Sequence, residues 1–192
     1  MGAVEKLKKL VLAAGLGFVA STALAADAAT LAFVDRINRT VEAINPADRS
    51  AIRAGCATLV EQTFDFETMA KSIAGEAWSR MSEKHRKAYV NGLAKRAAGD
   101  CTRSGREIAG NLVELVGVRA APDGDSNVAV RQSRGKQRTV IWRVRPGAGG
   151  ELKAVDMTVD GRSLATVARR DAKAILDNSH GDVTELVRSV GG

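Results

Sequence analysis

The sequence predicts an α+β fold, with helices first, a four-stranded antiparallel sheet next and helices again at the end. Two observations support this class. Up to about residue 101, apolar residues recur at spacings of three and four, the period of an amphipathic helix. Between residues 111 and 160 the period becomes two, and turn-forming clusters interrupt it. Helical and extended segments separated along the chain in this way are typical of proteins whose helices stack on one face of a sheet.

Four helices are predicted in the first half of the chain. They cover residues 29–44, residues 47–62, a short segment from Glu67 to Trp78, and a longer segment that opens at Ser82 and includes Cys101. Asp65 and Ser82 are suitable N-caps, because their side-chain oxygens can accept hydrogen bonds from the free amides of a first helical turn. The first half of the domain is therefore expected to be helical throughout.

Four strands with short turns between them are predicted next, which makes an antiparallel meander. They cover residues 111–119, 127–133, 138–145 and 151–160. Such a sheet can bury one face and expose the other. We expect the buried face to carry Val140, Trp142 and Val144 from the third strand, and Val155, Met157 and Val159 from the fourth.

Two further helices are predicted after the sheet. Residues 163–178 form the longer one, with Ser163 as its N-cap, and residues 182–190 form a short last helix. His180-Gly181 separates them. We see no internal repeat and no second domain.

The first 25 residues have the anatomy of a secretory signal peptide. Three lysines precede an apolar run at residues 10–19, and Ala23-Leu24-Ala25 is a small-x-small cleavage signal. A membrane anchor is the alternative, but this run is shorter than the roughly 20 residues that a bilayer requires. We therefore expect residues 1–25 to be removed on export, with cleavage after Ala26 as the alternative, and residues 26–192 to form a single domain.

The chain is basic, with 29 lysines and arginines against 22 acidic residues and a net charge of +7. Removing the signal peptide takes away three lysines and Glu5, which leaves 26 basic and 21 acidic residues, or about +5. This excess favours anionic partners such as lipid head groups or an acidic protein surface. Nucleic acid is not an expected partner, because the basic residues are scattered and no basic run alternates with stacking aromatics.

Cys56 and Cys101 are the two cysteines of the chain. An exported protein meets an oxidising compartment, and an even count permits one disulfide between them. Both cysteines fall on apolar helical faces. Two separate buried thiols are therefore the alternative, since the spacing does not show whether those faces meet.

No residue pattern indicates catalysis or metal binding. The two histidines, His85 and His180, fall at helix ends, and no pair of His, Cys or carboxylate residues has metal-ligand spacing. Residues 133–138, SRGKQR, look like part of a phosphate loop but lie between two strands, so we interpret them as a hairpin turn. We therefore expect neither an enzyme nor a cofactor. A small-molecule enzyme and a protein-interaction adaptor with a filled core are the alternatives.

The chain has only seven aromatic residues, and three of them lie in FDFETMAKSIAGEAW, residues 64–78. Ala70, Ala74, Gly75 and Ala77 leave room around these rings. A curled sheet covered by helices either fills its interior with side chains or leaves a concave apolar space of the kind that binds ligands. Composition alone favours the filled core.

Two segments resemble the MlaC family of periplasmic phospholipid shuttles, also called the toluene-tolerance family. The first is FDFETMAKSIAGEAW followed by SEKHRKAYVNGL, and the second is LKAVDMTVDGRSLATVARR at residues 152–170. The resemblance spans roughly residues 30–190. The positions that match the family pattern are Phe64, Asp65, Phe66, Ala70, Gly75, Trp78, Gly161, Ser163, Leu164 and Arg169.

The resemblance implies an α+β fold with a deep apolar pocket between sheet and helices, a periplasmic location and the binding of phospholipid acyl chains. It also implies a shuttle that passes lipid between an outer-membrane lipoprotein complex and an inner-membrane ABC-transporter complex. Such a shuttle would support the lipid asymmetry of the outer membrane. It needs no catalytic residue, and we expect it to act as a monomer.

We expect the pocket to be lined from the helices and from the inner face of the sheet. The predicted lining residues are Phe64, Phe66, Met69, Ile73, Trp78 and Tyr89 on the helices, Val140, Trp142, Val144, Val155, Met157 and Val159 on the sheet, and Leu164 in the last long helix. The chain departs from the family pattern in that helix, where Ala168 and Ala172 stand in place of large aromatic residues. This departure predicts a wider or reshaped pocket.

Overall fold

The computed structural model describes residues 23–24, 27–135 and 138–191. The predicted signal peptide and its cleavage site lie outside the described residues, apart from Ala23 and Leu24. In the part of the chain that is described, no helix is both long enough and apolar enough to cross a membrane.

Helices come before and after the sheet in the sequence, as predicted. They are α1 Ala28–Glu42, α2 Arg49–Thr63, α3 Phe66–Ala74, α4 Ala77–Arg80, α5 Glu83–Arg103 and α6 Gly105–Ile108 before the sheet, and α7 Leu164–Asn178 and α8 Val183–Ser189 after it. Asp65, Ser82 and Ser163 cap α3, α5 and α7, because each side chain accepts a hydrogen bond from the amide three residues further on. The three predicted caps are confirmed.

The helix predicted between Glu67 and Trp78 is instead two helices, α3 and α4. Gly75 ends α3 with a φ of 57°, a backbone conformation that favours glycine. The prediction of one helix was wrong because the apolar spacing continues across the break, whereas the break itself depends on the backbone torsion of one residue.

Within the described residues the sheet has the order β1-β2-β3-β4-β5-β6, and all neighbouring strands are antiparallel. The four long strands form the predicted meander: β2 Val113–Ala120, β3 Ser126–Gln132, β4 Thr139–Pro146 and β5 Leu152–Val159. Two-residue strands extend it at the edges, β1 Ala23–Leu24 beside β2 and β6 Arg162–Ser163 beside β5. A 3-10 turn, Pro122–Gly124, connects β2 to β3.

A β-bulge at Val155 interrupts the predicted alternation of β5. Arg143 on β4 pairs with Asp156, while the next residue, Val144, pairs with Ala154, so Val155 is the extra residue between them. Ala154 therefore takes the inner position and packs in the sheet's core cluster. Val155 is also buried, at 7% exposure, so the bulge places two consecutive buried residues, Ala154 and Val155, in this strand.

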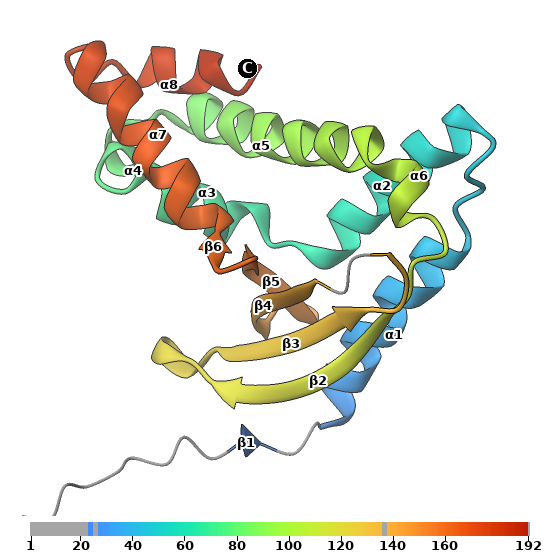
Figure 1. The fold of residues 1–192 in the computed structure, drawn as a ribbon. Coiled ribbons are helices and arrows are strands. Elements are labelled where there is room, and N and C mark those ends of the chain that lie inside the picture. The colour runs from blue at the N-terminus through green and yellow to red at the C-terminus, as the bar shows by residue number, and fades with distance from the viewer. Residues whose placement is uncertain (1–22, 25–26, 136–137, 192) are drawn as a thin grey trace, which may run out of the picture.

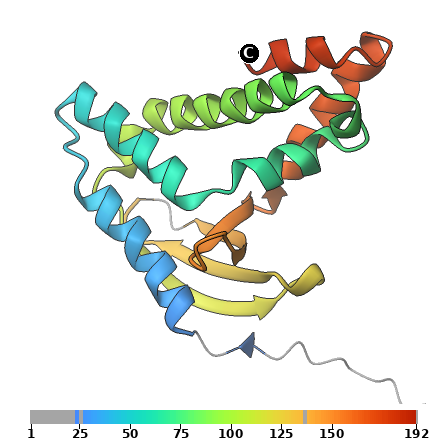
Figure 2. The same ribbon diagram turned by 180° about the vertical axis from the view of Figure 1, so that it is seen from behind.

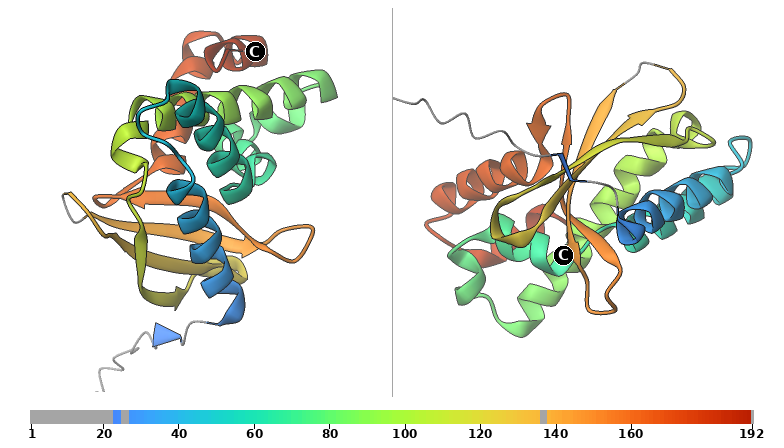
Figure 3. Two further views of the ribbon diagram at one scale, coloured as in Figure 1. Left: turned by 90° about the vertical axis from the view of Figure 1, so that its right-hand side faces the viewer. Right: turned by 90° about the horizontal axis from the view of Figure 1, so that it is seen from below.

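The sheet lies at one end of the molecule and the long helix α5 at the other, with α3 and α7 between them (Figure 1). Helix α1 runs along the sheet and leads into α2 (Figure 2). Views from the side and from below show the twisted sheet beneath the helical layer (Figure 3). The helices therefore cover one face of the sheet, as the fold class predicts.

The buried apolar residues form two main clusters. One cluster joins α3, α5, α7 and α8, and Tyr89 and Leu186 are its most buried large side chains, at 1% exposure each. The other joins α1 to the inner face of the sheet, where the rings of Phe33 and Trp142 pack edge to face with centroids 5.6 Å apart. Phe64, in the link between α2 and α3, packs against both clusters. The seam between the two clusters therefore runs past Phe64.

A disulfide joins Cys56 on α2 to Cys101 on α5, with Cα atoms 5.6 Å apart. Of the two arrangements that the sequence leaves open, the structure has this one. Ile44 and Ile52 pack around Cys56 in a third, smaller cluster. The bond holds α2 against the C-terminal half of α5.

Candidate functional site

An apolar cavity of about 380 Å³ lies between the inner face of the sheet and helices α1, α2, α5 and α6. We name it the sheet-side cavity. Trp142 and Met157 form part of its wall on the sheet, and Ile37 and Leu59 face them from α1 and α2. Its lining is mostly apolar, with polar side chains such as Gln132 where β3 ends.

A second apolar cavity, of about 340 Å³, lies between α3, α5, α7 and α8. We name it the helical cavity. Met69 from α3, Tyr89 from α5, Ile175 from α7 and Leu186 from α8 line it. Burial raises the pKa of Tyr89 to about 12, so its phenol is a neutral part of this wall at physiological pH.

The two cavities adjoin, because Ala97, Asp100 and Leu164 line both of them. Each volume lies within the range of roughly 300–1,000 Å³ that is typical of ligand pockets. The interior of the described chain is therefore not completely filled by side chains. The filled core that composition alone favours is not what the structure shows.

The FDF segment contributes one ring to the wall of each cavity. Phe64 lines the sheet-side cavity and Phe66 the helical cavity, with their ring centroids 5.7 Å apart. Asp65 between them caps α3 and donates its backbone amide to the carbonyl of Ala154 at 2.9 Å. One short segment thus ties the helical layer to β5 and places a ring in each cavity.

Most of the predicted lining residues line one of these cavities. In the sheet-side cavity are Phe64, Val140, Trp142, Met157 and Val159, in the helical cavity are Phe66, Met69, Ile73 and Tyr89, and Leu164 lines both. The prediction grouped these residues around one pocket. The structure divides them between two adjoining cavities.

Trp78, Val144 and Val155 line neither cavity. Trp78 lies on α4, beyond the turn at Gly75, and the guanidinium of Arg86 lies 5.4 Å from its ring centroid. Val144 is fully buried in the sheet's core cluster beneath α1. Val155 is the bulge residue of β5.

Several lining residues were not among those predicted. They are chiefly Ile37 and Val41 on α1, Leu59 on α2, Leu93 and Ala97 on α5, and Ala168 and Ala172 on α7. All lie on helices whose apolar spacing is visible in the sequence, but spacing does not show which apolar face borders a space. The two alanines that depart from the family pattern both lie on the wall of the helical cavity.

The cavities open beside the first turns of α7, where two large apolar side chains are exposed. Leu164 is 42% exposed and Val167 is 36% exposed, and both line the helical cavity. Charged side chains lie at the same opening: Arg96 and Asp100 on α5, and Asp171 on α7. This combination of an apolar interior and a charged rim suits a ligand with a long apolar part and a polar end.

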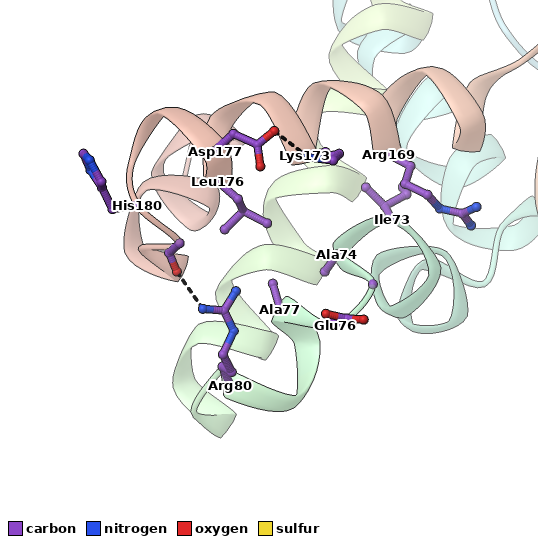
Figure 4. A pocket seen from close by; sticks show the side chains of 12 residues that line it. Ile73, Ala74, Glu76, Ala77, Arg80, Arg169, Lys173, Leu176, Asp177 and His180 are labelled. Atoms are coloured by element: carbon purple, nitrogen blue, oxygen red, sulfur yellow. Dashed lines mark hydrogen bonds and ion pairs between the residues drawn. The ribbon is translucent and has the colours of Figure 1, made fainter.

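A separate surface groove of about 620 Å³ lies between the α3–α4 turn and α7 (Figure 4). At its edge Arg80 donates a hydrogen bond to the carbonyl of Gly181 at 3.0 Å, and Lys173 pairs with Asp177 at 2.6 Å. The first of these interactions joins α4 to the turn before α8, and the second lies within α7. Arg80, Lys173 and Asp177 thus have structural partners.

The two histidines line neither cavity; His180 lies at the edge of the surface groove (Figure 4). Among the residues with described positions, no group of His, Cys, Asp and Glu side chains is arranged to hold a metal ion.

The fold and the cavities define a class: α+β proteins that keep an apolar space between a twisted antiparallel sheet and a helical layer. The model of one family, described as MlaC protein, matches residues 30–190 of this chain. The chain therefore belongs to the MlaC family, and the resemblance inferred from its motifs is confirmed.

Six chains of solved structures match this fold. One is a phospholipid-binding protein from Ralstonia solanacearum, solved in complex with a phospholipid. It is 20% identical to this chain, with a TM-score of 0.69, and the match covers 85% of this chain and 93% of that one. At this identity the likeness shows a shared fold. No curated protein matches the chain.

Proposed function

We propose that this protein binds a phospholipid with its acyl chains in the sheet-side and helical cavities. The observation that carries the proposal is the pair of adjoining apolar cavities, which open beside exposed Leu164 and Val167. Membership of the MlaC family supports it. So does the shared fold with a protein that was solved with a phospholipid bound.

The physical chemistry of the lining suits an acyl chain. Each methylene that moves from water into an apolar cavity contributes roughly 0.8 kcal/mol. The two adjoining cavities offer a continuous apolar space for acyl chains. Ala97, Ala168 and Ala172 line the helical cavity with small side chains, which occupy little of its volume. Met69, in the same lining, is a flexible side chain that adapts to the shape of its neighbours.

We further propose that the protein carries its lipid through the periplasm between an outer-membrane lipoprotein complex and an inner-membrane ABC-transporter complex. Family membership supports this role, which would maintain the lipid asymmetry of the outer membrane. In this proposal residues 1–25 direct export and are then removed. Residues 26–192 act as a single lipid-binding domain, as a monomer and without a cofactor.

Native mass spectrometry of the protein purified gently from the periplasm tests lipid binding. We expect an adduct with the mass of a phospholipid, which releases acyl-chain fragments on activation. A clean lipid-free mass would overturn the proposal. The same intact mass tests the export step, since a chain that begins at Ala26 is expected and a chain that retains residues 1–25 would contradict it.

Transfer between vesicles tests the carrier role. Donor vesicles contain a self-quenched fluorescent phospholipid, acceptor vesicles contain none, and dequenching reports transfer. We expect the transfer rate to rise with protein concentration. A protein that binds lipid but leaves the rate at its spontaneous value, even in the presence of both membrane complexes, would contradict the carrier role alone.

A further inference from the structure

The charged side chains at the cavity opening indicate which head group the cavities would take. Given the proposed phospholipid binding, on which this inference rests, we propose that the opening selects phospholipids whose head group carries both a phosphate and a primary ammonium, such as phosphatidylethanolamine. Arg96 binds the phosphate, and Asp100 and Asp171 bind the ammonium.

The face of α5 that borders the cavities changes from apolar to charged. Arg96 and Asp100 lie four residues apart, so their side chains leave the helix on one face, one turn from each other. Leu93 and Ala97, on the same side of the helix, line the helical cavity with them. Asp100 also lines the sheet-side cavity. A carboxylate therefore lies where the two cavities adjoin.

The facing side of α7 shows the same change. Leu164, Ala168 and Asp171 follow one another at spacings of four and three residues, which places them along one face. All three line the helical cavity. Leu164 and Val167 are 42% and 36% exposed, so a lipid whose chains fill the cavities would cover them. The head group of this lipid would then lie between Asp171 on α7 and the turn of α5 that carries Arg96 and Asp100.

The rim charges are available to a ligand. Arg96 is exposed and forms no ion pair with any carboxylate in the described part of the chain. Asp100 pairs with Arg103, and Asp171 with Arg170 at 3.4 Å. Both pairs are exposed and join neighbours on one helix, so each contributes little. Their carboxylate oxygens keep lone pairs that can accept hydrogen bonds from an ammonium.

Arg96, together with two carboxylates whose own ion pairs are exposed and weak, is complementary to a zwitterion. A phosphoglycerol head group would bring its phosphate towards the two carboxylates without offering them a positive charge. A phosphocholine head group has the positive charge but no N–H donor. A primary ammonium has both, and charge-assisted hydrogen bonds are the stronger kind. The expected order of preference is therefore phosphoethanolamine, then phosphocholine, then phosphoglycerol.

A competition between head groups tests the inference. The purified protein exchanges its lipid with vesicles that contain equal amounts of phosphatidylethanolamine, phosphatidylcholine and phosphatidylglycerol with identical acyl chains. The lipid is then extracted from the re-isolated protein and quantified by mass spectrometry. We expect phosphatidylethanolamine to exceed phosphatidylglycerol by about fivefold, because exposed charge contacts contribute small factors.

Variants separate the head-group contacts from the cavities. In the double variant Asp100→Asn with Asp171→Asn, the preference should fall to about unity, while total lipid per protein stays unchanged. Arg96→Gln should reduce the binding of all three lipids. Asp177→Asn, on α7 but at the surface groove, is the matched control and should keep the preference.

Two results would overturn the head-group inference while leaving lipid binding intact. They are a wild-type protein that loads the three lipids equally, and a double variant that keeps the wild-type preference. A protein that takes up no lipid from any vesicle would instead overturn the proposed function, and the inference with it.

Discussion

Asp125 is a buried carboxylate at the turn between β2 and β3, with 4% of its surface exposed. It accepts hydrogen bonds from Arg143 at 2.6 Å and from Arg145 at 2.9 and 3.0 Å. Burial raises the pKa of Asp125, but the hydrogen bonds and charges of Arg145 and Arg143 lower it further, and the net shift is downward. Because Trp142 and Val144 point inward on β4, this network lies on the outer face, opposite the cavities.

Asp125→Asn should destabilise the protein without changing lipid binding. The substitution removes the buried carboxylate that Arg143 and Arg145 share and leaves Arg143 only the exposed carboxylate of Asp123. We expect a loss of about 1–3 kcal/mol. Urea unfolding at neutral pH measures it, with the bound lipid quantified in parallel. Equal stability of the two proteins would contradict the role given to this network.

The lowered pKa of Asp125 also predicts part of the acid sensitivity. A carboxyl group with a lowered native pKa contributes stability above its ordinary value of 3.8, and that contribution is lost as the pH falls through the native value. Wild type should therefore lose stability faster than Asp125→Asn on acidification below that pH. Unfolding midpoints between neutral pH and acid pH measure the difference, and parallel curves would argue against it.

At the scale of the element, the break between α3 and α4 leaves Trp78 outside the helical cavity that Phe66 lines. Gly75→Ala should destabilise the protein by about 1–2 kcal/mol, because alanine disfavours the left-handed backbone at this position. An added Cβ would meet no atom within 4 Å, so the cost is conformational. Thermal unfolding measures the change.

Gly99→Ala is the matched control for that substitution. Gly99 lies within α5, and the nearest atom to an added Cβ is an arginine nitrogen at 3.9 Å. Alanine favours a helix interior, so this variant should be stabilised by about 0.5–1 kcal/mol. Opposite signs for the two glycine variants are the expected result, and a loss of stability in both would contradict the explanation.

The disulfide links two helices that are separated by 45 residues in the sequence. Closing a loop of this length restricts the unfolded chain by about 4 kcal/mol on the chain-entropy estimate. The double variant Cys56→Ser with Cys101→Ser should therefore unfold at a clearly lower urea concentration than the wild type. A reductant should bring the wild type to the same value and leave the variant unchanged. An unchanged midpoint on reduction would show that the bond contributes nothing.

Local features of the elements could be predicted from the sequence, whereas departures from regular geometry could not. The caps Asp65 and Ser163 depend on residues within one turn, so their pattern is visible in the chain. The break at Gly75 ends a helix, and the bulge at Val155 adds one residue to a strand. Neither irregularity changes the spacing of the apolar residues in the sequence. The break at Gly75 explains why Trp78 lies outside the helical cavity, and the bulge explains why Ala154 takes an inner position beside Val144.

At the scale of the whole molecule, the protein keeps two apolar clusters apart instead of merging them into one core. The seam between them could not be predicted from periodicity, because Ile37 and Leu59 have the same spacing whether they face protein or empty space. The family resemblance predicted an apolar pocket between sheet and helices. The structure shows two adjoining cavities. Ala168 and Ala172 lie on the wall of the helical cavity, and the wider pocket that they predict stays a prediction.

The most direct test of the central claim, that lipid occupies the joined cavities, is to fill the place where they adjoin. Ala97 on α5 lines both cavities, and Lys95 on the same helix is exposed and lines neither. Phospholipid extracted per folded protein is measured for wild type, Ala97→Trp and Lys95→Trp, with circular dichroism as the check of folding. We expect Lys95→Trp to retain the wild-type amount of lipid and Ala97→Trp to lose most of it. A folded Ala97→Trp protein that carries as much phospholipid as Lys95→Trp would contradict the claim.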